Sequence, residues 1–289
     1  MMHFKIKNVV VLGSGVMGSG IACHLANVGL KVLMLDLLPP NLSPDEKDNS
    51  KLRNSVAQTA LDKSIKSKPA PLYKKSYSSR ISVGNFEDHF ENINEADWII
   101  EVVVERLDIK KMIFEKVEKY RKPGSLVSSN TSSIPIAFLA EGRSDDFKKH
   151  FCGTHFFNPP RYLRLLEIIP TKESSQKMID FFMHFGDINL GKQTVLCKDT
   201  PAFIANRIGV MAGAKVFEIT EKYELSIEEV DAITGTIIGR PNTATYRLQD
   251  LVGLDTSDKV TKFVVENVKG DPFFEKVGKA AVPKFFTFL

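Results

Sequence analysis

A histidine and a glutamate in the middle of the chain have the residue types of a proton-transfer pair. His155 lies in an aromatic and proline-rich stretch that limits the access of water to its ring, and Glu167 is the single carboxylate of the apolar run 165–169. A buried carboxylate is costly unless it is paired, and neighbouring strands would bring the two side chains together. Glu167 would then orient the imidazole through one nitrogen, leaving the other to accept a proton. Alternatively, both residues are structural and have unrelated partners.

Three glycines near the start of the chain have the spacing of a dinucleotide-binding turn. They follow the apolar run 9–12 and precede a stretch with helical spacing. Gly13 would permit a tight turn, Gly15 would let the backbone approach a pyrophosphate, and Gly18 would let the helix pack close to the strand. The N–H groups at the start of that helix would face the phosphates.

An acidic residue completes this pattern at the end of the next apolar run, residues 31–36. Asp36 lies 18 residues after Gly18, close to the roughly 20 expected of the acid that binds a ribose 2′-hydroxyl. A carboxylate there would also repel a 2′-phosphate, so the pattern favours NAD over NADP. Ser14, Val16 and Met17 complete the predicted cofactor loop, although Met17 has an equally good interpretation as core packing.

Three further polar clusters follow predicted strands. They are Glu105 with Lys110, the serine-rich turn 128–133, and residues 154–160 around His155. Ligands of doubly wound sheets bind beyond the carboxyl ends of the strands, which makes these clusters candidate site residues. A serine-rich turn is also a common helix cap, and Ser133 before Ile134 and Pro135 fits that role.

The order of apolar patterns predicts the fold that positions these residues. Strand and helix patterns alternate along the first two thirds of the chain, and helical patterns follow. We therefore expect a Rossmann-type doubly wound, mostly parallel sheet in residues 1–198 and an all-α domain in residues 199–289. The predicted strands include 31–36, 81–83, 97–104, 126–129, 165–169 and 194–197, and the predicted helices include 43–65 with a cap at Ser43, 107–120, 174–185 and one that starts at 199–201 and runs to about 223. Asn206 would lie about two turns into that last helix, facing either an inter-domain cleft or solvent.

Composition limits the classes of function. The chain has 289 residues, 43% hydrophobic content and a net charge of +4, which is too mild a balance to indicate nucleic-acid binding. Three widely separated cysteines without ligand spacing predict a reduced compartment and no metal site. An early first strand leaves no room for a signal peptide, and no apolar run approaches the roughly 18 residues of a membrane span. We expect a soluble cytoplasmic protein.

A basic stretch interrupts the regular pattern between the second and third strands. Residues 51–80 contain eight basic residues and a single acid, Asp62. A solvated helix face explains such a run, and a landing surface for an anionic part of the substrate is the alternative.

Taken together, the motifs resemble those of the L-3-hydroxyacyl-CoA dehydrogenase family, from the glycine loop to about Asp258. The matching segments are 13–22, 101–105 with Lys110, 129–133, 155–159, 166–169 and 199–207. Residues 239–246, leading into 250–256, look more like the dehydrogenase part of multifunctional fatty-acid β-oxidation enzymes, which also carry an enoyl-CoA hydratase part.

The resemblance implies NAD-dependent oxidation of an (S)-3-hydroxyacyl-CoA to a 3-oxoacyl-CoA, with His155 as the general base oriented by Glu167. By motif position, Ser132 and Asn206 would hydrogen-bond the oxygens of the substrate. Positions that contact NAD in the family are matched by Ser132, Glu105, Lys110 and Asn158. The partners implied are the acyl-CoA substrate, an enoyl-CoA hydratase part in the same pathway or polypeptide, and a second copy in a homodimer.

Two departures from the family pattern leave other functions open. Relatives continue into a closing Lys-x-Gly-x-Gly-Phe-Tyr-like segment, whereas residues 282–289 lack it, and the segment 39–80 differs from that of simpler members. A non-catalytic dinucleotide-binding fragment of a larger protein is therefore one alternative. A β-hydroxyacid dehydrogenase that acts without CoA is the other, although its expected lysine is not found near Asn206.

Overall fold

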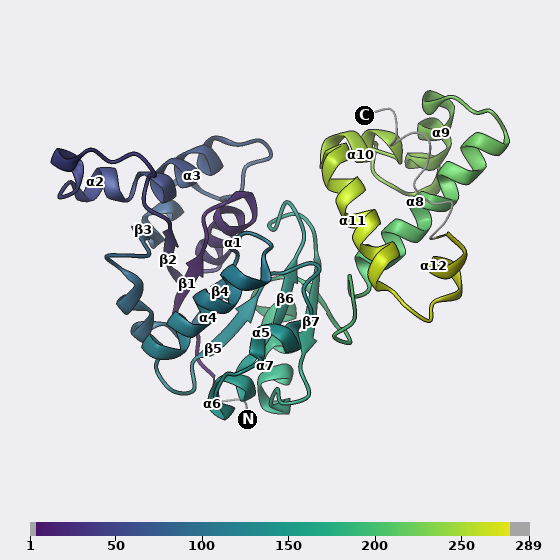
Figure 1. Cartoon of the computed structure of the whole chain (residues 1–289). Helices are drawn as coiled ribbons and strands as arrows, with labels where there is room; N and C mark the ends of the chain where they lie inside the picture. Colours follow the sequence, from purple (N-terminus) through teal and green to yellow (C-terminus); the bar gives the residue numbers. More distant parts are fainter. Residues whose placement is uncertain (1–3, 278–289) are drawn as a thin grey trace. The chain divides into compact units, whose positions relative to one another are not determined.

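The computed structural model describes residues 4–277, so the chain end at 282–289 lies outside the described residues. The chain divides into two compact units, Met1–Asp199 and Thr200–Leu289. Figure 1 shows that the first unit contains the sheet and that the second is helical. No helix of the described residues combines the length and the apolar character needed to cross a membrane.

The sheet of the first unit has eight strands in the order β3-β2-β1-β4-β5-β6-β7-β8. Its strands are β1 (Asn8–Leu12), β2 (Lys31–Asp36), β3 (Ile81–Asn85), β4 (Trp98–Glu101), β5 (Leu126–Ser129), β6 (Phe151–Phe156), β7 (Leu165–Pro170) and β8 (Gln193–Leu196). The pairings are parallel except between β6 and β7, which are antiparallel. The predicted doubly wound, mostly parallel sheet is confirmed, and its antiparallel step falls between the strands of His155 and Glu167.

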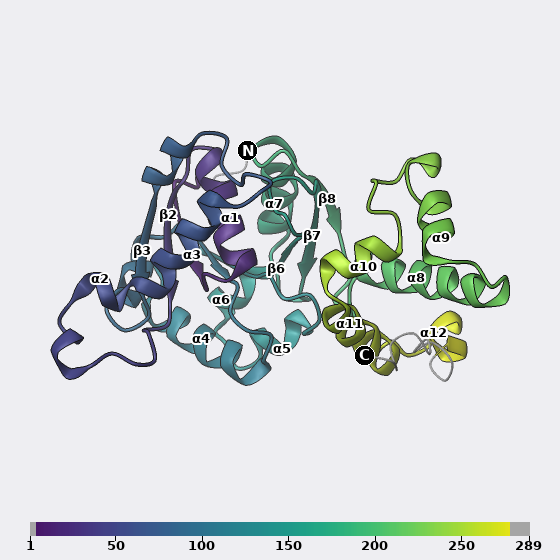
Figure 2. The same cartoon turned by 90° about the horizontal axis from the view of Figure 1, so that it is seen from above.

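Helices cover both faces of this sheet. Figure 2 shows α1 and α7 on one side and α4 and α5 on the other. The helical segments are α1 (Val16–Asn27), η1 (Pro44–Glu46), α2 (Ser50–Arg53), α3 (Ser55–Lys66), η2 (Lys75–Arg80), η3 (Phe90–Glu95), α4 (Leu107–Tyr120), α5 (Ile136–Ala140), α6 (Asp145–Lys149) and α7 (Gln176–Ile188). Both faces are sealed by aromatic rings: Trp98 lies 5.1 Å from Phe182 on one side, and Phe114 lies 5.1 Å from Phe151 on the other. Strands buried on both faces need such continuous apolar runs.

The predicted helix over 43–65 is wrong, because the structure breaks it into three pieces. Ser43 does cap a start, but only of the short η1 segment, through a capping box with Glu46. Asn49 then starts α2 by accepting hydrogen bonds from the N–H groups of Lys51 and Leu52. Side-chain caps of this kind end one helical segment and begin another, even where the spacing of apolar residues predicts a single continuous helix. The predicted strand 97–104 is also too long, since β4 ends at Glu101.

The predicted helix start at 199–201 is wrong as well. The helix α8 begins at Ala205, and Ala202 and Phe203 before it have positive φ angles of 61° and 49°. The Asp199 carboxylate caps a different helix, because it accepts hydrogen bonds from the N–H groups of Ile136 and Ala137 at the start of α5, both 2.8 Å long. Ser133, the cap proposed for that helix, bonds Glu105 instead.

The second unit is built from α8 (Ala205–Lys222), α9 (Ile227–Thr234), η4 (Thr236–Ile238), α10 (Tyr246–Val252), α11 (Leu254–Asn267) and α12 (Pro272–Val277). Phe217 of α8 and Tyr246 of α10 form one core contact, with ring centroids 5.3 Å apart. A second small core gathers around Val264 and Phe274. Asn206 lies in the first turn of α8, not two turns into it, and is half-buried.

Candidate active site

The glycine loop joins β1 to α1 in a conformation that larger residues would not fit. Gly13 has φ of 107°, and a Cβ atom there would lie 2.6 Å from the carbonyl oxygen of Val102. A Cβ on Gly18 would lie 2.0 Å from the Gly13 carbonyl oxygen, whereas a Cβ on Gly15 would meet nothing within 4 Å. The loop is therefore packed tightly at both ends and open at Gly15, where the N-terminus of α1 faces outward. An open backbone at a helix N-terminus suits a phosphate group.

Asp36 ties the end of β2 to this loop. Its Oδ2 atom accepts hydrogen bonds from the Ser14 N–H (2.6 Å) and the Ser14 hydroxyl (2.5 Å), and its Oδ1 atom accepts one from the Leu37 N–H. The carboxylate thus holds the loop and also borders the open space beside Gly15. Such a position suits a carboxylate that binds a ribose hydroxyl.

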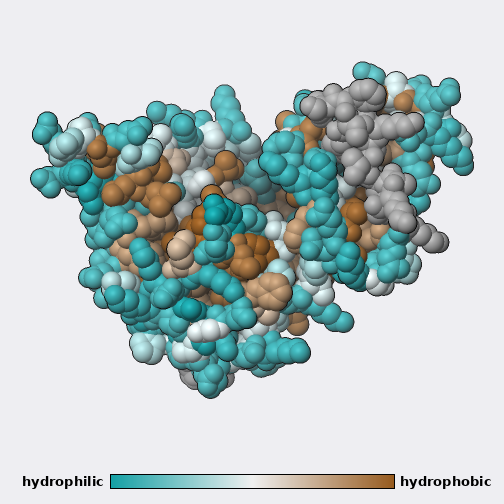
Figure 3. All heavy atoms as spheres, in the orientation of Figure 1, coloured by the Kyte–Doolittle hydropathy of each residue, from teal (hydrophilic) through white to brown (hydrophobic). Residues whose placement is uncertain are grey.

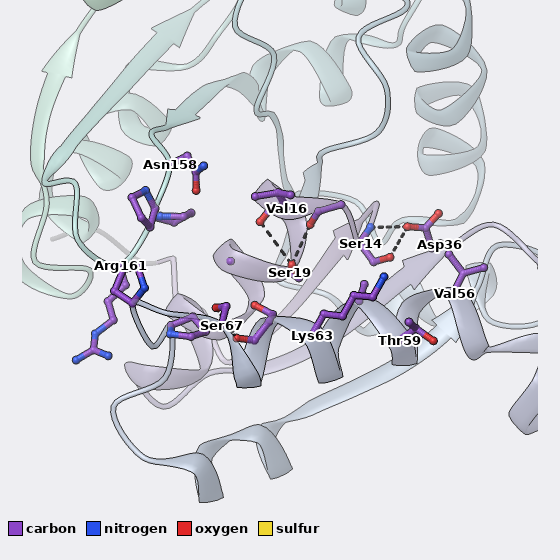
Figure 4. A pocket seen from close by; sticks show the side chains of 18 of the residues that line it. Ser14, Val16, Ser19, Asp36, Val56, Thr59, Lys63, Ser67, Asn158 and Arg161 are labelled. Atoms are coloured by element: carbon purple, nitrogen blue, oxygen red, sulfur yellow. Dashed lines mark hydrogen bonds between the residues drawn. The ribbon is translucent and has the colours of Figure 1, made fainter. Parts of the chain in front are cut away.

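A cavity of about 720 Å³ opens beside Ser14, Gly15 and Asp36. Its other walls are the exposed side of α3 and the loop that follows β6, and Figure 4 shows Lys63 reaching from α3 toward Ser14 and Asp36. Volumes of roughly 300–1,000 Å³ are typical of small-molecule sites. Apolar side chains are also exposed beside the glycine loop and after β2, including Val16 (74%) and Leu37 (65%). Figure 3 shows apolar patches between hydrophilic residues on this unit. A nucleotide has both the charge and the flat apolar surface that such a lining accepts.

A buried ion pair lies at the end of β4, next to the strand of the glycine loop. The Lys110 ammonium lies 2.6 Å from Glu101 Oε1 and 3.3 Å from Glu105 Oε2, and the side chains of Lys110 and Glu101 are about 1% and 0% exposed. Glu101 Oε2 also accepts a 2.5 Å hydrogen bond from the Ser129 hydroxyl. Burial raises the pKa of Glu101, and Lys110 opposes that rise. Lys110 is therefore enclosed by protein groups.

Glu105 connects this ion pair to the serine-rich turn after β5. Its Oε1 atom accepts hydrogen bonds from the Thr131 hydroxyl (2.6 Å), the Ser133 hydroxyl (2.7 Å) and the N–H groups of Ser132 and Ser133 (3.1 Å each). Burial raises the pKa of Glu105, but Lys110 and the hydroxyls outweigh it and the pKa is lowered. Glu105 stays charged and fixes the turn that carries Ser132, which is half-buried.

His155 and Glu167 face each other across the antiparallel strands β6 and β7. They are paired in register, and His155 Nδ1 lies 2.7 Å from Glu167 Oε2. The ring is 6% exposed and the carboxylate is fully buried. A carboxylate at this distance fixes the orientation of the ring and stabilises its protonated form. The predicted contact between the two side chains is thus present.

Three neighbouring side chains support the pair. Burial raises the pKa of the Cys197 thiol to about 12, and the Glu167 carboxylate beside it adds to that rise. The Asn130 side chain accepts a 2.9 Å hydrogen bond from the Phe156 N–H, next to His155. Phe157 packs against the imidazole at 4.4 Å. The thiol is held in its neutral form and donates a hydrogen bond to the carbonyl oxygen of Val195 (3.6 Å).

The remaining predicted site residues fall into separate groups. Asn158, exposed in the loop after β6, borders the cavity together with Val16. Met17 is partly buried and packs against the core. Asn206 belongs to the second unit, where its neighbour Arg207 forms a 2.7 Å ion pair with Asp271.

Sequence reasoning missed several residues that shape the site. Glu101 is a lone carboxylate at the end of an apolar strand, so the rule that singled out Glu167 also applies to it. Lys63 is one of eight basic residues in the stretch 51–80, and the pattern alone does not distinguish it from the others. Lys192 is nearly fully buried beneath the loop after β6, and no motif in the sequence around it indicates that position.

Comparisons with known proteins agree with this arrangement. The description "3-hydroxyacyl-CoA dehydrogenase, NAD binding domain" matches residues 8–200, and "3-hydroxyacyl-CoA dehydrogenase, C-terminal domain" matches residues 203–284. A Bacillus subtilis protein named "Probable 3-hydroxyacyl-CoA dehydrogenase" is 52% identical over 276 residues, covering 93% of this chain and 35% of the relative. A Deinococcus radiodurans protein of the same name is 44% identical over 251 residues, covering 87% and 70%.

Among solved structures, an (S)-3-hydroxybutyryl-CoA dehydrogenase from Ralstonia eutropha aligns with a TM-score of 0.73 at 27% identity, covering 95% of this chain and 93% of that one. The chain spans about a third of the length of the Bacillus relative (35%). The glycine loop with Asp36 belongs to the family's NAD-binding domain, so NAD is the cofactor of the first unit. Because both of its units match in order, this chain is a member of the 3-hydroxyacyl-CoA dehydrogenase family.

Proposed function

We propose that the chain oxidises the 3-hydroxyl group of an (S)-3-hydroxyacyl-CoA to a 3-oxo group, as in fatty-acid β-oxidation. The observation that carries this proposal is the His155–Glu167 pair, held at 2.7 Å in the same unit as the NAD-binding loop. The family membership and the names of the relatives support the same reaction.

His155 is the general base in this proposal. Its Nδ1 atom is engaged by Glu167, so the proton of the substrate hydroxyl would pass to Nε2. Glu167 stabilises the resulting imidazolium, and a positioned base of this kind contributes about 10²–10⁴-fold to a rate. Bound NAD would supply the acceptor for the hydride that leaves C3. Ser132, on the turn held by Glu105, and Asn206 are proposed to hydrogen-bond the substrate oxygens and so fix C3 for the transfer.

Cofactor binding is assigned to the loop and its surroundings. We assign the pyrophosphate to Gly13, Ser14, Gly15, Val16 and Gly18, the ribose to Asp36, and further contacts to Glu105, Ser132 and Asn158. Lys110 acts by holding Glu105 charged and in place, and Met17 acts through packing. Lys63 places a cation in the same cavity, which supports the basic stretch as a landing surface for the phosphates of an anionic ligand.

Substrate class is tested by comparing acetoacetyl-CoA with free acetoacetate while NADH absorbance is followed. We expect NADH consumption with the thioester and little with the free acid. Equal rates with both would favour a β-hydroxyacid dehydrogenase that acts without CoA. NADH binding without turnover of either compound would favour a non-catalytic binding fragment.

Asp36 provides a second test, directed at cofactor choice. Asp36→Asn keeps an oxygen acceptor for Ser14 but removes the charge that repels a 2′-phosphate. We expect its preference for NADH over NADPH to fall by about tenfold or more, which corresponds to about 1.4 kcal/mol. Affinities measured by fluorescence titration decide the point, with Asp62→Asn as a control, because Asp62 is an exposed carboxylate of α3 that does not line the cavity. An unchanged preference would show that Asp36 serves only to hold the loop.

We also propose partners and a cellular location for this protein. The second unit exposes many apolar side chains, among them Ile237 (77%) and Leu251 (65%), which supports pairing of two copies into a homodimer. The extra length of the Bacillus relative supports a further part, which we propose to be an enoyl-CoA hydratase. The cysteines Cys23, Cys152 and Cys197 are free and buried, as expected of a protein in the reducing cytoplasm.

A further inference from the structure

The loop between β6 and β7 connects the two halves of the site. It begins directly after His155 and Phe156 and ends directly before the strand of Glu167. Asn158, Pro159, Pro160 and Arg161 of this loop line the cavity on the side opposite the glycine loop. A shift of this loop would therefore move one wall of the cofactor cavity.

A buried lysine holds this loop at two points. The Lys192 ammonium, immediately before β8, donates hydrogen bonds to the carbonyl oxygens of Pro160 and of Leu163, the latter 2.8 Å away. Lys192 is 4% exposed. Within residues 4–277, no carboxylate lies at ion-pair distance from its ammonium. A buried charge without a carboxylate partner is unfavourable for stability unless hydrogen bonds compensate it, and here the two loop carbonyl groups provide those bonds.

The same loop is braced on its other side. Pro160 lies so close to α1 that a Cβ on Gly20 would be 3.0 Å from its ring. The Arg161 guanidinium donates to the carbonyl oxygens of Ala70 (2.5 Å) and Leu72 (3.0 Å), and the Tyr162 hydroxyl donates to Ala70 (2.9 Å). These contacts join the loop to α1 and to the segment after α3, and both of those elements border the cavity.

We propose that Lys192 is a positioning residue for the cofactor: it fixes the loop 157–164 so that Asn158 and Pro160 form the wall opposite the glycine loop. This inference rests on the proposed function for its catalytic consequence, but cofactor binding tests it independently. Lys192 itself acts through the backbone carbonyls and touches no ligand.

The charge state of Lys192 makes the expected NADH affinity depend on pH. Burial lowers the pKa of Lys192 to about 8. Among the described residues, His24 on α1 is a titratable group that interacts electrostatically with Lys192, and Arg161 acts on His24 in the same direction. His24 lies with Nε2 3.1 Å from the Leu190 carbonyl oxygen, and burial together with Lys192 lowers its pKa to about 4, so it stays neutral above that pH. Charge-assisted hydrogen bonds to the loop therefore weaken as the pH rises through about 8.

The test compares Lys192→Met, Lys192→Arg and the exposed control Lys172→Met by NADH fluorescence titration and by thermal unfolding. We expect Lys192→Met to weaken NADH binding about tenfold, Lys192→Arg to restore most of it, and Lys172→Met to match the wild type. The wild-type affinity should fall above pH 8, whereas that of Lys192→Arg should not, because a guanidinium stays charged.

Thermal unfolding separates positioning from folding. Lys192→Met should stay folded, because the loss of two hydrogen bonds is offset by the removal of a buried charge. Unchanged NADH affinity in Lys192→Met would overturn the proposal, as would a loss of affinity that follows a collapse of the melting temperature and is not restored by arginine. A wild-type chain that binds NADH but turns over no substrate would contradict the proposed function and leave this test intact.

Discussion

Replacing His155 with glutamine is expected to lower kcat by about a thousandfold, within the range of about 10²–10⁴ that a general base contributes. Glutamine can still donate a hydrogen bond to Glu167, so the strand pairing between β6 and β7 should persist. It cannot accept a proton at the position of Nε2. The loss should therefore appear in kcat while the affinity for NADH stays unchanged.

The matched control for this variant is His184→Gln, because His184 is an exposed histidine of the same unit, on α7. Stopped-flow or steady-state NADH consumption with acetoacetyl-CoA measures both variants. A His155→Gln enzyme whose kcat stays within about threefold of the wild type would show that His155 is not the base.

Replacing Lys110 with methionine is expected to lower the free energy of unfolding of the first unit by about 3–5 kcal/mol, the usual cost of leaving one partner of a buried ion pair alone. Lys110 forms ion pairs with Glu101 and Glu105, and the Ser129 hydroxyl donates a hydrogen bond to Glu101. Urea unfolding followed by Trp98 fluorescence measures the effect, because Trp98 is the single tryptophan and is fully buried on β4.

The loss in Lys110→Met should depend on pH in a defined direction. Burial raises the pKa of Glu101, and without Lys110 nothing of opposite charge opposes that rise. A carboxyl whose pKa is higher in the folded state binds a proton more readily there, so its contribution to stability falls as the pH rises above its unfolded pKa. Lys110→Met should therefore be less destabilised near pH 5 than near pH 8.

Two companion variants identify the cause of this loss. Lys110→Met combined with Glu101→Gln should recover part of the stability, because no charge is then left buried. Lys111→Met removes a largely exposed ion pair with Glu141 and should cost less than about 1 kcal/mol. Equal effects of Lys110→Met and Lys111→Met would contradict the view that the buried pair supports the site.

The sequence predicted best those structural features that depend on neighbouring residues in the chain. The glycine spacing predicted the turn between β1 and α1, and Asp36 was predicted at the end of β2. A single carboxylate in an apolar strand predicted the contact of Glu167 with His155. The helix Leu107–Tyr120 and the strand Leu126–Ser129 lie where their patterns placed them. In each case a short stretch of chain contains the physical cause.

The features that were missed depend on side chains that act at a distance. Asp199 caps a helix that begins 63 residues earlier in the chain, so the local pattern at 199–201 resembles a helix start although no helix begins there. Asn49 divides a stretch whose apolar spacing reads as one helix. Lys192 binds backbone carbonyls about 30 residues away. Because every residue has a backbone carbonyl group, residue types do not indicate which of them accepts such a bond.

The central claim is that His155 and Glu167 act together as the base of an NAD-dependent dehydrogenase. The most direct measurement is NADH consumption with acetoacetyl-CoA by the wild type, His155→Gln and Glu167→Gln, with NADH affinity measured on the same preparations. The account predicts turnover in the wild type, its collapse in both variants and NADH binding in all three. Turnover by either variant at the wild-type rate, or none in a wild-type chain that binds NADH, would contradict it.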